Sequence, residues 1–234
     1  MNYLYLILNL GSLIIPFLFS FHPKLKFYKL WKSLFISIAI TMAIFIFWDV
    51  IFTKNGFWGF NQGYHLRLKI FSLPIEEWLF FICIPYACVF THYSLLIYFP
   101  KMLVSRKATQ NTTLALAILF VIIAVLNYSK WYTTINFGYA FIFIMIVRKY
   151  NLKLLQHYLL TFIIMLAPFF LINGILTGSF IDNEVVWYNN NENLGIRLGT
   201  IPIEDTVYAF TLILTNLFLV ELINSKAIQA TTDQ

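Results

Sequence analysis

Two short acidic phrases interrupt a chain that is otherwise mostly apolar. Residues 72–78 read SLPIEEW and residues 200–206 read TIPIEDT, so the same proline and carboxylate pair recurs about 128 residues later. A carboxylic acid can donate a proton, and an ionised carboxylate beside it can remove one, which suits acid–base work on a substrate. The paired phrases therefore indicate a candidate catalytic site built from two distant segments.

Each phrase also predicts the start of a helix. Proline is favoured in the first helical turn, where its missing N–H has no intrahelical partner, so Pro74 and Pro202 mark two helix starts. Carboxylates in a first turn are stabilised by the helix dipole. Acids that merely support a helix start at a wet membrane interface are therefore the plainer alternative to catalysis.

The apolar surroundings favour the catalytic interpretation, because ionisable residues in membrane helices are costly and usually face a bundle interior. Adjacent helical residues point about 100° apart, so only one acid of each pair can face a shared interior. We expect Glu76 and Glu204, which are identical in the two phrases, to face inward. Glu77 and Asp205 are then expected to face loops or lipid headgroups.

The composition indicates a membrane protein. The 234 residues are 60% hydrophobic and only 11% charged, whereas soluble domains average about 25% charged. Apolar runs of about 20 residues recur along the whole length, so we expect one membrane domain, residues 1–234. The net charge of +6 comes from short basic clusters beside apolar runs. Such clusters are typical of membrane-flanking loops, and no nucleic-acid partner is expected.

Hydropathy and helix breakers predict an all-α polytopic fold with seven transmembrane helices. The expected spans are residues 3–21, 33–52, 72–99, 112–128, 131–147, 154–176 and 200–223.

Basic residues predict the orientation of these spans. Eleven of the 16 fall on one side, namely Lys24, Lys26, Lys29, Lys32, Lys101, Arg106, Lys107, Arg148, Lys149, Lys153 and Lys226. The positive-inside rule then places the N-terminus outside and the C-terminus in the cytoplasm, with both acidic phrases near the outer face.

An internal repeat surrounds the two phrases. The segment DVIFT from Asp49 matches NGILT from Asn173, and FWGFN from Phe57 loosely matches VWYNN from Val186. Two parallel three-helix repeats, residues 1–107 and 131–234, are therefore expected, related by an axis along the membrane normal. Two units of the same orientation need one extra span between them, so residues 108–130 form a bridging helix.

At this point the residues resemble a known family. LPIEEWLFFICIPYACVF from Leu73 and GIRLGTIPIEDTVYAF from Gly195 resemble the signature phrases of the integral membrane lycopene cyclases of the heterodimeric bacterial type. WDVIFT from Trp48 and NGILTG from Asn173 resemble the accompanying segments. The resemblance covers essentially the whole chain, with both subunits fused as in archaeal and fungal relatives.

The resemblance implies a function and a site. Lycopene cyclases of this family protonate the linear ψ end of lycopene, close a ring on the cation and release a proton, giving γ-carotene and β-carotene with β-ionone rings. The family's essential motif falls on Pro74, Glu76, Glu77, Pro202, Glu204 and Asp205. We expect Glu76 or Glu204 to be the acid.

Substrate binding is expected from aromatic and polar residues near the acids. These are Trp48, Asp49, Trp58, Phe60, Trp78, Asn173, Trp187, Tyr188 and Tyr208. Aromatic faces can stabilise a carbocation, although an interfacial aromatic belt is an alternative reading of the Trp-rich and Tyr-rich loops. Asp49 and Asn173 could orient a glutamate or simply bond locally.

No cofactor is expected, because the reaction is non-redox and no dinucleotide fingerprint is present. No spacing of His, Cys or carboxylates resembles a metal site. The expected partners are lycopene and membrane lipid in a bacterial cytoplasmic membrane, while association with other carotenoid-pathway enzymes and the oligomeric state stay open.

Other functions remain as alternatives. A carotenoid end-group hydratase or a cyclase of longer carotenoids would use the same protonation. A retinal photoreceptor needs a buried lysine, which the last two spans lack. A transporter typically has helices broken at the midplane, whereas the prolines of the two phrases stand at helix starts, with Pro85 and Pro168 inside spans as exceptions.

Overall fold

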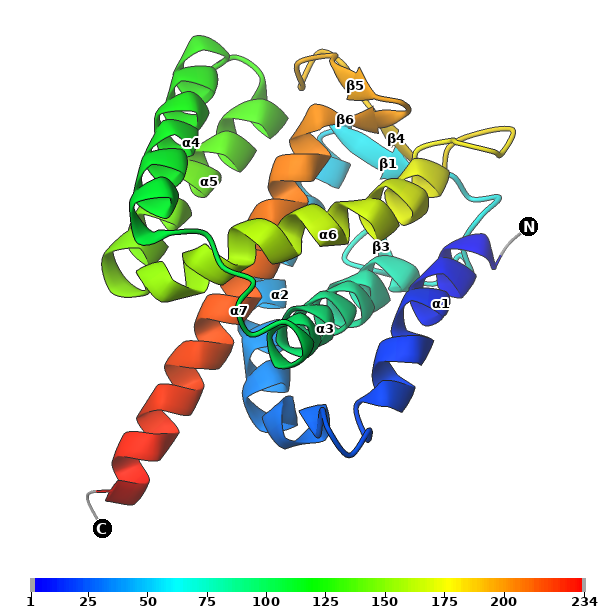
Figure 1. Ribbon diagram of the computed structural model, residues 1–234. Coiled ribbons are helices and arrows are strands. Elements are labelled where there is room, and N and C mark those ends of the chain that lie inside the picture. The colour runs from blue at the N-terminus through cyan, green and yellow to red at the C-terminus, as the bar shows by residue number, and fades with distance from the viewer. Residues whose placement is uncertain (1–2, 233–234) are drawn as a thin grey trace.

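Seven α-helices make up most of the computed structural model, which describes residues 3–232 and side chains as far as Ser225. The helices are α1 Leu4–Phe19, α2 Trp31–Lys54, α3 Ile75–Tyr98, α4 Arg106–Leu126, α5 Trp131–Tyr150, α6 Leu152–Leu176 and α7 Ile203–Thr232 (Figure 1). A short 3-10 helix, Phe27–Leu30, precedes α2. The predicted all-α fold with seven helices is confirmed. The side chain of Lys226, counted in the orientation prediction, lies outside the described residues.

The helices have the character of a membrane protein. Five of them, α2, α3, α4, α6 and α7, are long and apolar enough to cross a bilayer. At 16 residues, α1 is shorter than these, and α5 is not among the five. Large apolar side chains such as Phe47, Val125 and Ile163 are more than 60% exposed on the outside of the bundle. Such exposure has no hydrophobic cost where the surrounding solvent is lipid.

Three two-stranded ribbons gather at one end of the bundle. β2 (Lys69–Ile70) pairs with β3 (Leu73–Pro74) just before α3, and β5 (Arg197–Leu198) pairs with β6 (Ile201–Pro202) just before α7. Each hairpin ends with its proline at the start of a helix, and Pro74 is the N-cap residue of α3. The two acidic phrases therefore emerge from matched hairpins at the same end of the molecule.

A third ribbon joins the two repeats. β1 (Trp58–Phe60) pairs antiparallel with β4 (Val186–Tyr188), with Gly59 opposite Trp187 at the centre. β1 and β4 occupy matched places in the two repeats and pair antiparallel with each other. A two-fold axis through the centre of the ribbon requires this arrangement. The repeat organisation is consistent with this pairing. We call β1 and β4 together the cross-repeat ribbon.

The helices of the two units pack in matched ways. α1 packs on α3 and α5 packs on α7, while α2 crosses α7 near the centre (Figure 1). α4 follows the first unit and packs along α5 and α6 at the edge of the bundle. Fully buried side chains in the common core include Leu34, Val89, Ile144 and Leu217. The core thereby fixes α3 and α7, whose first turns hold the acids.

Candidate active site

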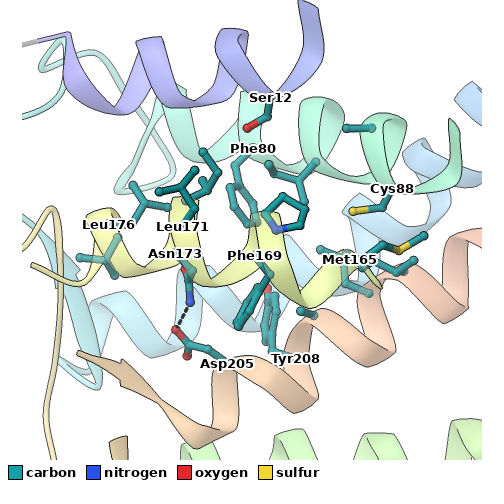
Figure 2. Close-up of a pocket in the computed structure, with 18 of the residues that line it drawn as sticks. Ser12, Phe80, Cys88, Met165, Phe169, Leu171, Asn173, Leu176, Asp205 and Tyr208 are labelled. Carbon is teal, nitrogen blue, oxygen red and sulfur yellow. Dashed lines mark hydrogen bonds between the residues drawn. The ribbon is translucent and has the colours of Figure 1, made fainter. Parts of the chain in front are cut away.

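A cavity of about 480 Å³ lies between α1, α3, α6 and α7 (Figure 2), and the cross-repeat ribbon also contributes to its wall. Most of its wall is apolar, with Phe, Leu, Ile and Met side chains. Three carboxylates line it, Asp49 from α2, Glu77 from α3 and Asp205 from α7. Acids in an otherwise apolar cavity are suited to proton chemistry on a hydrocarbon.

The orientation predicted for the acidic pairs is wrong. Glu77 and Asp205 line the cavity, whereas Glu76 and Glu204 do not belong to its wall. All four are buried, and Glu76 and Glu204 are completely so. The first acid of each pair turns toward the segment that precedes its helix, because that segment offers a backbone donor. The second acid, about 100° further round, then faces the interior.

Glu76 and Glu204 hold matched loops. The backbone N–H of Leu66 donates to Glu76 Oε1 at 2.7 Å, and that of Leu194 donates to Glu204 Oε1 at 2.7 Å. Glu204 Oε1 also accepts from the Thr133 hydroxyl at 2.7 Å. Both glutamates therefore fix the polypeptide that leads into their own hairpin.

Glu77 and Asp205 differ in their hydrogen-bond donors. Glu77 accepts from the phenol of Tyr5. Asp205 accepts from Tyr132 at 2.6 Å, from Asn173 Nδ2 at 2.8 Å and from Tyr188 at 2.9 Å. Three donors compensate a negative charge on Asp205 more completely than one donor does on Glu77. Figure 2 shows the Asn173 bond, with Tyr208 on the next turn of α7.

The sequence prediction located much of the cavity wall. Of the residues expected to bind substrate, six line the cavity: Asp49, Trp58, Phe60, Asn173, Tyr188 and Tyr208. Asp49 Oδ1 accepts a hydrogen bond from the phenol of Tyr208 at 3.1 Å. Asp49 and Asn173, matched in the repeat, thus both reach the site, one as an acceptor and one as a donor.

The other three expected residues lie outside the cavity wall. Trp48 packs against Tyr139, with ring centroids 5.3 Å apart. Trp78 is half-buried and its indole N–H donates to the Ile70 carbonyl at 3.3 Å. Trp187 covers Gly59, where an added Cβ would lie 2.4 Å from the indole. These tryptophan rings pack against other parts of the protein, where neighbouring aromatic rings or a glycine leave room for them.

A comparison with family models shows to which family the chain belongs. The lycopene cyclase family model matches residues 2–95 and again residues 129–223. The chain belongs to the lycopene cyclase family. It is accordingly an enzyme of carotenoid cyclisation with lycopene as its substrate. Searches of curated proteins and of solved structures found no match. The two matched stretches leave out α4, the helix between the repeats.

Residues of α1 and α5 also bond to the acidic phrases of this lycopene cyclase, and the sequence prediction missed them. Tyr5 and Tyr132 donate to the cavity acids. One turn later, Asn9 Nδ2 donates to the Glu76 carbonyl at 2.8 Å and Asn136 Nδ2 to the Glu204 carbonyl at 2.6 Å. The pattern Tyr-x-x-x-Asn-x-Gly at residues 5–11 and 132–138 was the available signal. It extends the repeat into the first helix of each unit.

Tyr188 is the one donor to Asp205 that comes from the cross-repeat ribbon. Burial raises the pKa of the Tyr188 phenol, and the nearby Asp205 raises this pKa further. The phenol therefore stays protonated in the physiological range and continues to donate. The ribbon is centred on Gly59 and Trp187, so the residue matched to Tyr188 in the first repeat is Phe60, one position away from the register expected from the sequence. Phe60 has no hydroxyl to offer.

Among the described residues, no group of three His, Cys, Asp or Glu side chains has an arrangement that could hold a metal ion. The carboxylates at the site are instead bonded to phenol, amide and backbone donors.

Proposed function

We propose that this enzyme is a lycopene β-cyclase that works by acid–base chemistry without a change of oxidation state. A proton adds to the terminal double bond of the ψ end and leaves a tertiary cation. The neighbouring double bond attacks that cation, which closes a six-membered ring, and loss of a ring proton gives the β-ionone end. One proton enters and one leaves, so no reductant or oxidant is required.

The observation that supports this proposal best is the pair of unlike carboxylates, Glu77 and Asp205, in one apolar cavity. We assign Glu77 as the acid, because its single donor, Tyr5, leaves a negative charge on it poorly compensated. Asp205, with three donors, suits the role of a lasting carboxylate. Such a carboxylate stabilises the cation and then accepts the ring proton.

Proton return completes the cycle. After one ring has formed, Asp205 holds a proton and Glu77 has lost one, so one proton must pass back before the next turnover. Asp49 also lines the cavity and accepts from Tyr208. Asp49 thus lies in the same cavity as the two acids.

Aromatic residues favour a cyclase over a hydratase. Trp58, Phe60 and Tyr208 present rings to the cavity, and ring faces stabilise a cation within about 6 Å. Trp58 is only 6% exposed. A dry cavity leaves proton loss as the way to quench the cation, whereas a hydratase must admit water to it.

Glu76 and Glu204 act as positioning residues in this proposal. Each carboxylate holds the loop before its own hairpin, and the adjacent residue in the first helical turn is the cavity acid. In this proposal the two acids of each pair therefore have two different tasks. Residues 1–107, 108–130 and 131–234 are proposed as first unit, bridge and second unit, with the acids toward the outer face of a bacterial cytoplasmic membrane.

The test is turnover by the purified chain in lipid vesicles loaded with lycopene, without added nucleotide or reductant. Cyclic carotene with β rings is expected. In D₂O each new ring should gain one deuterium at the protonated carbon. A hydroxylated product would instead indicate a hydratase, and a strict requirement for reductant would contradict the non-redox mechanism.

A further inference from the structure

The cavity is a long slot with its acids at one end. On α3 its wall follows one helix face through Glu77, Phe80, Ile84, Cys88 and Thr91. Thr91 is fourteen positions after Glu77, a distance of about 21 Å along a helix at 1.5 Å per residue. Figure 2 shows Asn173 and Asp205 near one end, and Cys88 and Met165 near the other. The shape fits an extended chain lying lengthwise.

The long side of the slot reaches the outside of the bundle between α1 and α6. Its wall includes Ile15 of α1, which is 63% exposed, and Leu171 of α6, which is 57% exposed. Gly11, also in the wall, has nothing within 4 Å of the place of a Cβ. Gly11 stands at the middle of α1, whereas Ile15 and Leu171 lie four and five residues before the ends of their helices, and exposed apolar side chains such as Leu18 and Phe170 flank them. The opening therefore faces lipid chains and not water.

The matched gap of the second unit is closed. Under the repeat, α5 corresponds to α1 and α2 corresponds to α6. Tyr139 of α5 packs on Trp48 and Phe45 of α2, with ring centroids 5.3 and 5.4 Å apart. Trp48 and Phe45 are themselves 4.4 Å apart. Three aromatic rings therefore fill the place where the other side of the molecule has its slot.

The residues at the matched positions explain the difference. Aligned through Tyr5 and Tyr132, Ser12 of α1 stands where α5 has Tyr139. Aligned through Asp49 and Asn173, Ile172 of α6 stands where α2 has Trp48. Ser12 and Ile172 both line the slot, and the Ser12 hydroxyl bonds back to the Leu8 carbonyl at 2.8 Å. Two smaller side chains keep the gap open.

From this comparison we propose that the gap between α1 and α6 is a lateral slot through which one end of the linear carotene passes from the bilayer to the acids. Ser12 and Ile172 determine whether the slot is open. The inference rests on the proposed function for the identity of the occupant. The substrate is an uncharged hydrocarbon, so the apolar wall binds it by burial and the lipid-facing opening delivers it without contact with water.

The test closes the slot with the residues that close the matched gap. Ser12→Tyr and Ile172→Trp are each placed in a Glu77→Gln background and produced in lycopene-making cells. The bound pigment per purified chain is then measured by absorbance. Glu77→Gln alone should retain lycopene, and each plugged variant should retain at least about tenfold less, because apolar burial of the chain is lost. The two closing substitutions lie on different helices, so the slot can still be tested if one of these plugged variants fails to fold.

Ile14→Tyr in the same background is the matched control. Ile14 is 56% exposed on α1 and does not line the slot, so the added ring should leave the bound pigment unchanged. Elution profile and melting temperature establish that each variant is folded. Undiminished pigment in both plugged variants, or an equal loss with Ile14→Tyr, would overturn the slot. Replacement of lycopene by bound lipid in Glu77→Gln would overturn it as well.

Failure of the slot and failure of the proposed function appear in different measurements. Continued ring formation by Glu77→Gln would overturn the assignment of the acid, whatever the amount of pigment bound. A plugged chain with wild-type Glu77 should lose cyclisation of lycopene in membranes through a higher KM. An unchanged KM in both plugged chains would contradict the slot while leaving the acid–base assignment in place.

Discussion

The two units of this lycopene cyclase build one site from the same scaffold with different hydrogen bonds. Leu66 and Leu194 hold the first acids in the same way, at the same distance. The second acids then diverge, since Glu77 accepts from one donor and Asp205 from three. Duplication thus supplies matched positions for two carboxylates, and divergence around them gives these carboxylates unlike hydrogen-bond surroundings.

Among changes around the acids themselves, the largest expected effect comes from making the second unit resemble the first. Asn173→Asp replaces a donor to Asp205 with a second acceptor, as Asp49 is in the first unit. Losing a hydrogen bond to a charged group costs about 1.5–3 kcal/mol, which predicts a fall in kcat/KM of about 10- to 100-fold. Pigment chromatography after incubation with lycopene measures it. The reverse change, Asp49→Asn, should have a smaller effect, and equal losses would contradict the asymmetry.

The donors from the first helix of each unit provide the next comparison. Tyr5 is the donor to Glu77, whereas Tyr132 is one of three donors to Asp205. Tyr5→Phe is expected to change the rate about tenfold and to shift its pH profile, because the acid loses its one phenol. Tyr132→Phe should leave the pH profile of the acid in place. A shift caused by Tyr132→Phe alone would reverse the assignment of acid and base.

The cross-repeat ribbon can be broken at its centre. At Gly59 an added Cβ would stand 2.4 Å from a carbon of the Trp187 ring, so Gly59→Ala should destabilise the protein by about 1–3 kcal/mol, as overpacking does. Thermal unfolding in detergent, followed by tryptophan fluorescence, measures the change. Gly63→Ala, at an exposed turn of the same segment, is the control. Equal melting temperatures for both variants would show that the ribbon tolerates the methyl group.

The smallest effect concerns a backbone conformation shared by the two units. Arg67 has φ +65° and the matched Gly195 has φ +72°. A side chain in this left-handed region is strained, while glycine loses more chain entropy on folding, so Arg67→Gly should stabilise by about 1 kcal/mol or less. Gly195→Arg should destabilise by a similar amount. A melting-temperature change of the same sign in both variants would contradict this reading.

Much of the fold was predictable from the sequence, because long apolar runs and helix-start prolines report local physics. The cavity wall was partly predictable, since the repeat placed Asp49, Asn173 and the loop aromatics near the acids. The choice between adjacent acids was not predictable. It depends on where the backbone N–H groups of Leu66 and Leu194 point, and tertiary packing determines this. Trp48 packs on Tyr139, whereas its matched residue Ile172 lines the cavity. Tertiary packing determines this difference too, so it was not predictable from the sequence.

The central claim is that the second acid of each phrase works on the substrate while the first holds a loop. It is tested most directly by the initial rate of lycopene cyclisation for Glu76→Gln, Glu77→Gln, Glu204→Gln and Asp205→Asn at equal amounts of folded protein. Glu77→Gln and Asp205→Asn should lose about 10²- to 10⁴-fold, as removal of an acid or base does. Glu76→Gln and Glu204→Gln should retain much more activity, because an amide oxygen can still accept the loop N–H. Full activity of Glu77→Gln and Asp205→Asn, with inactive Glu76→Gln and Glu204→Gln, would contradict the account.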